Sequence, residues 1–127
     1  MFDHVSLGVT DLARSAAFYD AVLGALGYER LPCESARAAL YGPPGHLGEA
    51  PFAVIAQREG PVHGRGTHLA FLGRSREAIN GFHAQALVHG GTCDGPPGIR
   101  DHYAPGYYAA FVVDPDGHRI EAVLHEG

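Results

Sequence analysis

The chain has 127 residues, of which 46% are hydrophobic and 18% charged, and its formal net charge is −5. These values indicate one globular domain and argue against nucleic acid or an anionic membrane surface as the main partner. No apolar run is long enough to span a membrane and no signal segment follows Met1, so we expect a cytoplasmic protein. The distant Cys33 and Cys93 favour reduced thiols, with a disulfide as the alternative.

The first half of the chain predicts a β-α-β-β-β unit. Residues 2–9 (FDHVSLGV) indicate a strand, because apolar residues alternate with polar or small ones. A helix follows, with Thr10 or Asp11 as its N-cap and Gly27 at its end. Further strands are expected at 28–32, around 38–41 and at 52–57. The apolar stripe of the helix contains Leu12, Ala16, Tyr19, Leu23 and Leu26, with Phe18 and Val22 beside it.

The same order of elements restarts after a linker. Residues 58–66 are rich in glycine and charge, which is typical of a connection. A strand is then expected at 67–72, and a helix at 76–89 with Ser75 as its N-cap. The buried face of this helix is predicted to carry Ile79, Phe82, Ala86 and Leu87. We expect a short strand at 92–93, a long loop at 95–106, and strands at 107–113 and 118–125.

The two halves therefore read as a duplicated unit. At a constant offset of 64 residues, the identical pairs are His4 and His68, Phe18 and Phe82, Leu23 and Leu87, and Gly27 and Gly91. The shared order of elements carries more weight than these few identities. The pattern predicts an α+β fold with two βαβββ modules, whose curved mixed sheets surround a cleft with the helices on the outside. One domain covers 1–127, with module one at about 1–57, a linker at about 58–66 and module two at about 67–127.

Three polar residues stand out as candidate metal ligands. His4 and His68 lie on the opening strand of each module, and Glu121 lies on the last strand. Strand alternation places each of them opposite the larger apolar side chains, on the expected cleft face. Two imidazoles and one carboxylate suit Zn, Fe, Mn, Ni or Co, and the sequence does not choose among these metals. The alternative is that all three are polar residues of solvated sheet faces.

Three segments also carry a resemblance to the vicinal oxygen chelate superfamily, which includes glyoxalase I, fosfomycin-resistance transferases, bleomycin-resistance proteins and extradiol dioxygenases. They are DHVSLGVTDLARSAAFYDAVLGALGY, GTHLAFLG and YYAAFVVDPDGHRIEAVLH, and DPDGHRIEAV is the most specific part. The resemblance implies paired βαβββ modules, a homodimer, and a divalent metal held by His4, His68 and Glu121. Open metal positions would chelate two adjacent substrate oxygens. Glyoxalase I sites generally have a second carboxylate as the fourth ligand. In this chain the offset of 64 residues makes Gln57 the counterpart of Glu121 in module one, so Gln57 is a possible fourth ligand.

A second group of candidates surrounds the segment 100–108 (RDHYAPGYY). This segment is aromatic-rich and leads into a strand, which fits a functional loop and equally an ordinary connection. A tyrosine hydroxyl near a metal can orient substrate or transfer a proton, and adjacent strand residues face opposite ways, so at most one of Tyr107 and Tyr108 should reach the site. Arg119 shares the face of Glu121 and fits either an anionic group or a surface ion pair. The catalytic candidates are Glu121, Tyr107 and Tyr108, and the substrate-binding candidates are His102, Tyr103 and Arg119.

These observations favour a metal-dependent enzyme acting on a small oxygenated metabolite. Glyoxalase-like lyase or isomerase chemistry, or transferase chemistry, would use bidentate chelation and a Lewis-acid metal. The alternative is a non-catalytic protein that binds a small molecule or sequesters an antibiotic, as the bleomycin-resistance relatives do. In either case the expected partners are a small molecule and a second copy of the chain, without nucleic acid or membrane.

Overall fold

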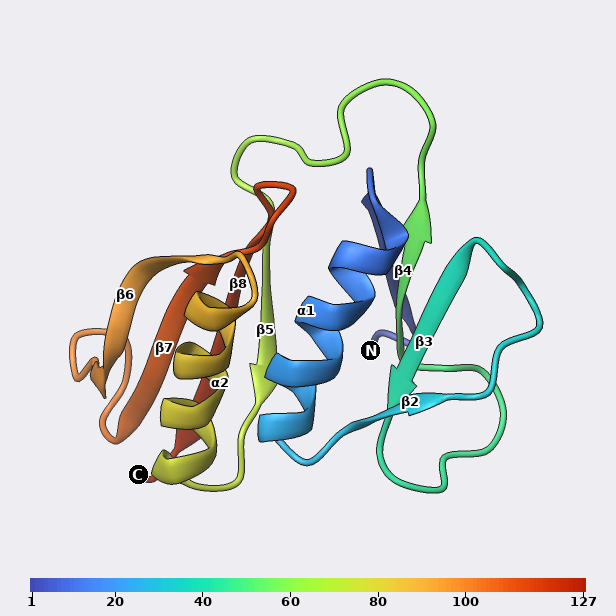
Figure 1. Ribbon diagram of the computed structural model, residues 1–127. Helices are drawn as coiled ribbons and strands as arrows, with labels where there is room; N and C mark the ends of the chain where they lie inside the picture. The colour runs from blue at the N-terminus through green and yellow to red at the C-terminus, as the bar shows by residue number, and fades with distance from the viewer.

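Two four-stranded mixed sheets and two helices make up the computed structural model, which describes residues 1–127 (Figure 1). The first sheet has the order β1-β4-β3-β2 and the second the order β5-β8-β7-β6. The predicted α+β class with two βαβββ modules is therefore confirmed. Neither helix has the length and hydropathy that a membrane crossing requires. The elements are β1 (Val5–Val9), α1 (Leu12–Ala25), β2 (Glu29–Leu31), β3 (Ala38–Gly42), β4 (Phe52–Ala56), β5 (His68–Leu72), α2 (Arg76–Val88), β6 (Thr92–Ile99), β7 (Tyr107–Val113) and β8 (Arg119–His125).

In each sheet the opening strand of the module pairs in parallel with the last strand of the same module. β1 lies beside β4, and β5 lies beside β8, while the remaining neighbours are antiparallel. Within the second sheet the register places His68 opposite Arg119 and Ala70 opposite Glu121. This parallel pairing brings His68 and Glu121, which are 53 positions apart in the sequence, onto one face of the sheet.

Helix α1 begins and ends at the residues that its sequence predicts. The Asp11 side chain caps the helix by accepting a hydrogen bond from the backbone N–H of Arg14 at 3.1 Å. Its end is followed by Gly27, whose φ of +91° is accessible to glycine at little cost. The buried residues of α1 are Ser15, Ala16, Phe18, Tyr19, Val22 and Leu23.

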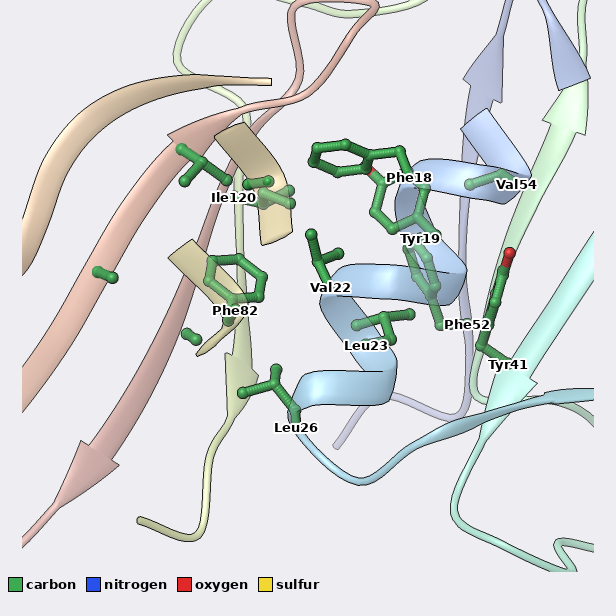
Figure 2. Close-up of a cluster of buried hydrophobic side chains, with 14 of the residues drawn as sticks. Phe18, Tyr19, Val22, Leu23, Leu26, Tyr41, Phe52, Val54, Phe82 and Ile120 are labelled. Carbon is green, nitrogen blue, oxygen red and sulfur yellow. The ribbon is translucent and has the colours of Figure 1, made fainter. Parts of the chain in front are cut away.

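One hydrophobic core joins the two modules through their helices. α1 packs against α2, and side chains from both helices and both sheets form a single buried cluster. In Figure 2, Val22 of α1 and Leu26, the C-cap residue that follows α1, point toward Phe82 of α2, whereas Tyr19 lies beside Phe52 of the first sheet, with ring centroids 5.3 Å apart. The helices thus pack against each other between the two sheets of one chain, and each keeps one face exposed to solvent.

The arrangement of the helices decides where the other face of each sheet points. The sheet residues that join the core, such as Val9 and Val54 in the first sheet and Ile120 in the second, face the helices. Because side chains alternate along a strand, Ser6 and His68 lie on the opposite faces, and both residues are exposed. The faces that carry the proposed ligands therefore point away from the shared core in a single chain.

Two expectations for the second module were wrong. The predicted loop at 95–106 is shorter, because β6 continues through Gly95–Ile99 and pairs with β7. β6 is an edge strand with register shifts on both sides of Gly95, and such edges and bulges accommodate the prolines that argued for a loop. On α2, Ile79, Phe82 and Ala86 are buried, but Leu87 is 47% exposed, since it follows Ala86 by 100° around the helix.

A tight turn between β7 and β8 fastens the second module to the start of α1. Asp116, whose side chain is 2% exposed, accepts hydrogen bonds from the Thr10 hydroxyl at 2.6 Å, the Ser15 hydroxyl at 3.2 Å and the Arg14 guanidinium at 3.2 Å. A carboxylate at a helix N-terminus is also favoured by the helix dipole. The Tyr19 hydroxyl, which belongs to the same helix, donates to Asp114 at 2.6 Å. We call Asp114 and Asp116 the acidic latch.

The acidic latch explains the specificity of the DPDGH motif. Asp114 also accepts hydrogen bonds from the backbone N–H groups of Asp116 and His118, which shapes the turn. Gly117 has a φ of +96°, a conformation that glycine adopts at little cost. His118 is buried, and its Nε2 donates to the Gly8 carbonyl of β1 at 2.7 Å. The motif therefore connects the modules and does not itself form part of the candidate site.

We predict that Asp116→Ala lowers the free energy of unfolding by about 1–3 kcal/mol, because it removes the partner of the buried Ser15 hydroxyl and the contacts to Thr10 and Arg14. Urea denaturation followed by circular dichroism measures this change. Glu59→Ala is the control, since Glu59 is exposed and forms no ion pair, and its effect should stay within about 0.5 kcal/mol. A loss below about 0.5 kcal/mol for Asp116→Ala would show that the latch does not stabilise the docked modules.

Candidate functional site

The centre of the candidate site is a contact between β5 and β8. His68 Nε2 lies within hydrogen-bond distance of Glu121 Oε1, as strand alternation and parallel pairing lead one to expect. The His68 side chain is 40% exposed, whereas that of Glu121 is 5% exposed. A buried carboxylate thus meets a solvent-accessible imidazole on the sheet face opposite the helices. A nitrogen and an oxygen atom that approach one point are suitable donors for a divalent metal.

The second oxygen of Glu121 is held by a tyrosine. The Tyr107 hydroxyl, on β7, donates a hydrogen bond to Glu121 Oε2 at 2.7 Å. Burial and the neighbouring Glu121 carboxylate both raise the pKa of Tyr107, so its hydroxyl stays protonated and remains a donor. The interaction fixes the orientation of the carboxylate and leaves Oε1 directed at His68. Because a buried carboxylate without partners is costly, Tyr107 also stabilises the charge of Glu121.

Aromatic rings surround this carboxylate. The Tyr107 ring is in edge contact with the rings of Tyr103 and His125, with centroids 5.2 Å apart in both cases. The Phe111 ring lies 5.9 Å from the His68 ring. Phe111 was absent from the predicted site, although alternation along β7 places it on the same face as Tyr107. The rings limit water access to Glu121 and leave His68 as its open side.

Two predicted substrate-binding residues, His102 and Tyr103, lie in the loop between β6 and β7, and only Tyr103 contacts the rings around Glu121. Tyr103 is 57% exposed and reaches the rings of Tyr107 and Phe111. His102 is exposed and contacts the Tyr103 ring, with centroids 4.4 Å apart. Tyr103 therefore belongs to the aromatic surround of the site, whereas His102 reaches it only through Tyr103.

His4 lies just before β1 in the first sheet, separate from this centre. Its Nδ1 donates to the Asp3 carboxylate at 2.6 Å, an interaction that raises the pKa of His4 and leaves Nε2 without a partner. No group of three or more His, Cys, Asp or Glu side chains in the chain is arranged to hold a metal ion. A single chain thus brings His68 and Glu121 together and does not add His4. The physical reason is the helix-to-helix docking, which directs the ligand faces of the two sheets outward.

The other candidates make no hydrogen bond or ion pair with Glu121. Gln57 follows β4 in the first sheet, where its backbone N–H donates to the Val9 carbonyl. The Tyr108 hydroxyl donates to Asn80 of α2 at 2.6 Å, so Tyr108 faces the helix and has no contact with Glu121. Arg119 is exposed and forms an ion pair with Asp94 at 2.7 Å. Of the two adjacent tyrosines, only Tyr107 reaches the site, as alternation requires.

An apolar groove of about 460 Å³ lies between the first sheet and β5. Its walls include Val5 and Phe52 from the first sheet and Leu69 and Phe71 from the second, and ten of its thirteen lining residues are hydrophobic. Leu72 at one end is 63% exposed. The groove borders β5, the strand that carries His68, and offers a surface for an apolar ligand or a protein partner.

Two modules of this topology, with a histidine and a carboxylate on neighbouring strands, define a glyoxalase-like class of protein. The profile of the Glyoxalase/Bleomycin resistance protein/Dioxygenase superfamily matches residues 1–122, and the chain belongs to this superfamily. No match occurs among curated proteins. The chain is 37% identical to a glyoxalase/bleomycin resistance protein from Albidiferax ferrireducens T118, with a TM-score of 0.76 and coverage of 97% of both chains.

Two further solved structures share the fold at lower identity. A glyoxalase-related enzyme from Fulvimarina pelagi is 20% identical, with a TM-score of 0.72 and coverage of 97% of this chain and 86% of that one. A glyoxylase/bleomycin resistance protein/dioxygenase domain from Frankia sp. EAN1pec is 21% identical, with a TM-score of 0.71 and coverage of 99% and 98%. At these identities the likeness extends to the fold alone.

We predict that Tyr107→Phe lowers the free energy of unfolding by about 1–2 kcal/mol, because Glu121 loses a hydrogen-bond donor in a buried position. Equilibrium denaturation in urea at neutral pH measures the loss. Tyr103→Phe is the matched control, since the Tyr103 hydroxyl has no hydrogen-bond partner, and this variant should unfold like the wild type. Equal stabilities of the two variants would contradict the role given to Tyr107.

Proposed function

We propose that this protein is a metal-dependent enzyme that acts on a small oxygenated metabolite, through lyase, isomerase or transferase chemistry. The observation that carries the proposal is the convergence of His68 Nε2 and the buried Glu121 Oε1 on one sheet face. Membership of a superfamily that contains glyoxalases and dioxygenases supports an enzymatic role. The exposed side of His68 gives a substrate access to this pair.

The donor set fits a divalent cation such as Zn, Fe, Mn, Ni or Co only in part within one chain. His68 and Glu121 would supply two ligands, and a third ligand has to come from elsewhere. When bound, such a cation would polarise two adjacent substrate oxygens as a Lewis acid. The fit is supported by the Tyr107 hydrogen bond, because metal-binding carboxylates are usually oriented by a further hydrogen bond.

The chain's own residues have separate roles in this proposal. Glu121 would be one of the residues that hold the metal and the base that accepts a proton from substrate, and Tyr107 would hold the carboxylate in place. Tyr103 and Phe111 would pack against substrate carbon atoms and exclude water from the carboxylate. His102 contacts the Tyr103 ring, so it would act on a substrate only indirectly, by positioning Tyr103.

We further propose that the protein is a homodimer in which the third metal ligand is His4 of the partner subunit. Three features support this assignment. His4 is exposed with a free Nε2, the ligand faces of both sheets point away from the shared core, and β1 and β5 are open sheet edges. In a two-fold dimer, the first module of one chain would meet the second module of the other, which would create two equivalent sites.

The second candidate function is non-catalytic binding of a small apolar molecule. The groove of about 460 Å³ favours it, because its lining is mainly hydrophobic and its size is in the range of small-molecule pockets. A metal would then be unnecessary. A His68→Ala, Glu121→Ala double variant that keeps full affinity for a ligand of the wild-type protein would favour this function over the enzymatic one.

We predict that the protein purified without chelator binds about one divalent metal ion per chain. His68→Ala and Glu121→Ala should each weaken metal binding by about tenfold or more, since each removes a direct ligand. Isothermal titration calorimetry with Zn, Mn, Ni and Co measures the affinity. His102→Ala serves as the control, because His102 contacts only the Tyr103 ring and should leave affinity unchanged. Absence of uptake by the wild type would end the metal-dependent proposal.

Mixing two inactive variants tests whether the site is shared between subunits. His4→Ala and Glu121→Ala homodimers should each lose the metal site. After unfolding and refolding together in equal amounts, about one quarter of the wild-type metal capacity should return, because half of the dimers are mixed and each holds one intact site. Metal analysis after gel filtration measures the capacity. A mixture with no recovered sites would contradict a shared site, and a monomer in gel filtration would do so independently.

A further inference from the structure

A second, polar pocket of about 300 Å³ lies beside the candidate site. Residues 63–67 at the end of the loop between β4 and β5 form one wall, and Gly117 and Arg119 form the other. None of the lining residues is hydrophobic, in contrast to the groove beside β5. The His63 ring fits against Gly117, where a Cβ atom would lie 2.7 Å from His63 Nε2. A side chain at position 117 would therefore close part of this pocket.

The pocket presents positive charge that the rest of the chain neutralises only in part, through the ion pair of Arg119 with Asp94. Arg65 is exposed and forms none of the ion pairs in the chain, although the net charge of the protein is −5. Arg119 uses Nη1 for its ion pair with Asp94 and has no other hydrogen bond, so Nε and Nη2 remain available. His63 adds a third nitrogen-bearing side chain that has no hydrogen-bond partner. Two guanidinium groups at one opening suit the oxygens of an anion.

Backbone donors add to this charge. The N–H groups of Gly64, Arg65 and Gly66 donate no hydrogen bond to any other group of the chain. Gly66 has a φ of +78°, and successive free N–H groups next to a left-handed residue form a concavity suited to anions. The Thr67 hydroxyl at the edge of the pocket is a further donor.

The position of the pocket relates it to the candidate site. Thr67 directly precedes His68, and Arg119 lies opposite His68 in the parallel register. Arg119 is two residues before Glu121 on the same strand face, a separation of about 7 Å along β8. A molecule with its reactive oxygens at the His68–Glu121 pair can therefore extend an anionic group of a few bonds' length into the polar pocket.

We propose that the polar pocket binds an oxyanion group, a phosphate or carboxylate, carried by the substrate. Arg65 and Arg119 hold the anion, and the free N–H groups of residues 64–66 complete its hydrogen bonds. The assignment of the oxyanion to a substrate rests on the proposed function. The affinity of the pocket for an oxyanion is independent of that function. The substrate class is accordingly an oxygenated small molecule whose anionic group lies a few bonds away from its reactive oxygens.

Titration of the metal-free protein with inorganic phosphate tests the pocket directly. Amide chemical shifts in ¹⁵N-labelled protein are followed at constant ionic strength, with sodium chloride as the reference. We expect saturable shifts confined to residues 63–67 and the turn around Gly117, with millimolar affinity. Arg65→Gln and Arg119→Gln should each weaken phosphate binding by about fivefold or more. Arg65 makes no ion pair or hydrogen bond through its side chain, so its variant tests the proposal even if Arg119→Gln disturbs the fold.

Two controls separate the outcomes. Arg58→Gln removes an exposed arginine of the same loop that does not line the pocket, and it should leave the affinity unchanged. Glu121→Ala should also retain phosphate binding, since the pocket is distinct from the His68–Glu121 pair. No saturable binding, or equal losses for Arg58→Gln and Arg65→Gln, would overturn the proposal. Loss of phosphate binding in Glu121→Ala would show that the pocket is not independent of the His68–Glu121 pair and would overturn the proposal as well.

Carboxylate and phosphate are distinguished by repeating the titration with acetate. Tighter binding of phosphate indicates a substrate with a phosphoryl group, and tighter binding of acetate indicates a carboxylate. Failure of metal uptake with intact phosphate binding would remove the proposed enzymatic function and leave the anion pocket standing. Metal uptake without phosphate binding would overturn the anion pocket alone and leave the proposed enzymatic function standing.

Discussion

Asp116 is the residue on which the relative position of the two modules depends most. It is nearly inaccessible to solvent, yet it carries a carboxylate whose partners all come from the first turns of α1 in the other module. Removing the Ser15 hydroxyl or the Asp116 carboxylate leaves the other group buried without this partner, which is costly, so the contact favours the docked arrangement. The shared core between α1 and α2 then has a single geometry, and that geometry directs both ligand-bearing faces outward.

The chemistry of the site follows from a contrast in burial. Glu121 is enclosed by Tyr107 and neighbouring rings, whereas its partner His68 is open to solvent. Tyr107 donates to one oxygen of the carboxylate, and the other oxygen contacts His68. A substrate or metal would therefore approach the Glu121 carboxylate from the exposed side of His68. The apolar groove is lined by residues 69–72 of β5, whereas the polar pocket is lined by Thr67 just before this strand, so the two recesses lie toward opposite ends of β5.

Much of this architecture could be predicted from local sequence patterns. The period of apolar residues identified both helices and most strands, and alternation predicted that His68, Glu121 and one of two tyrosines share a face. β6 could not be predicted, because its prolines resemble a loop until β7 is present as a pairing partner. The acidic latch and the position of His4 depend on how the modules dock. Docking is a tertiary property that spacing within a strand does not encode.

The form of β6 has a consequence for how copies of this chain can meet. Open strand edges are templates for aggregation, and proteins protect them by short length, prolines or bulges. β6 has two prolines and shifts of register, and β2, at the far end of the other sheet, has only three residues. β1 and β5 are regular five-residue edges, and one carbonyl of each, Gly8 and Leu72, accepts a hydrogen bond from a side chain of the same chain. Edge-to-edge growth is thus disfavoured at β2 and β6 by the strands themselves, and at β1 and β5 by side chains of the same chain.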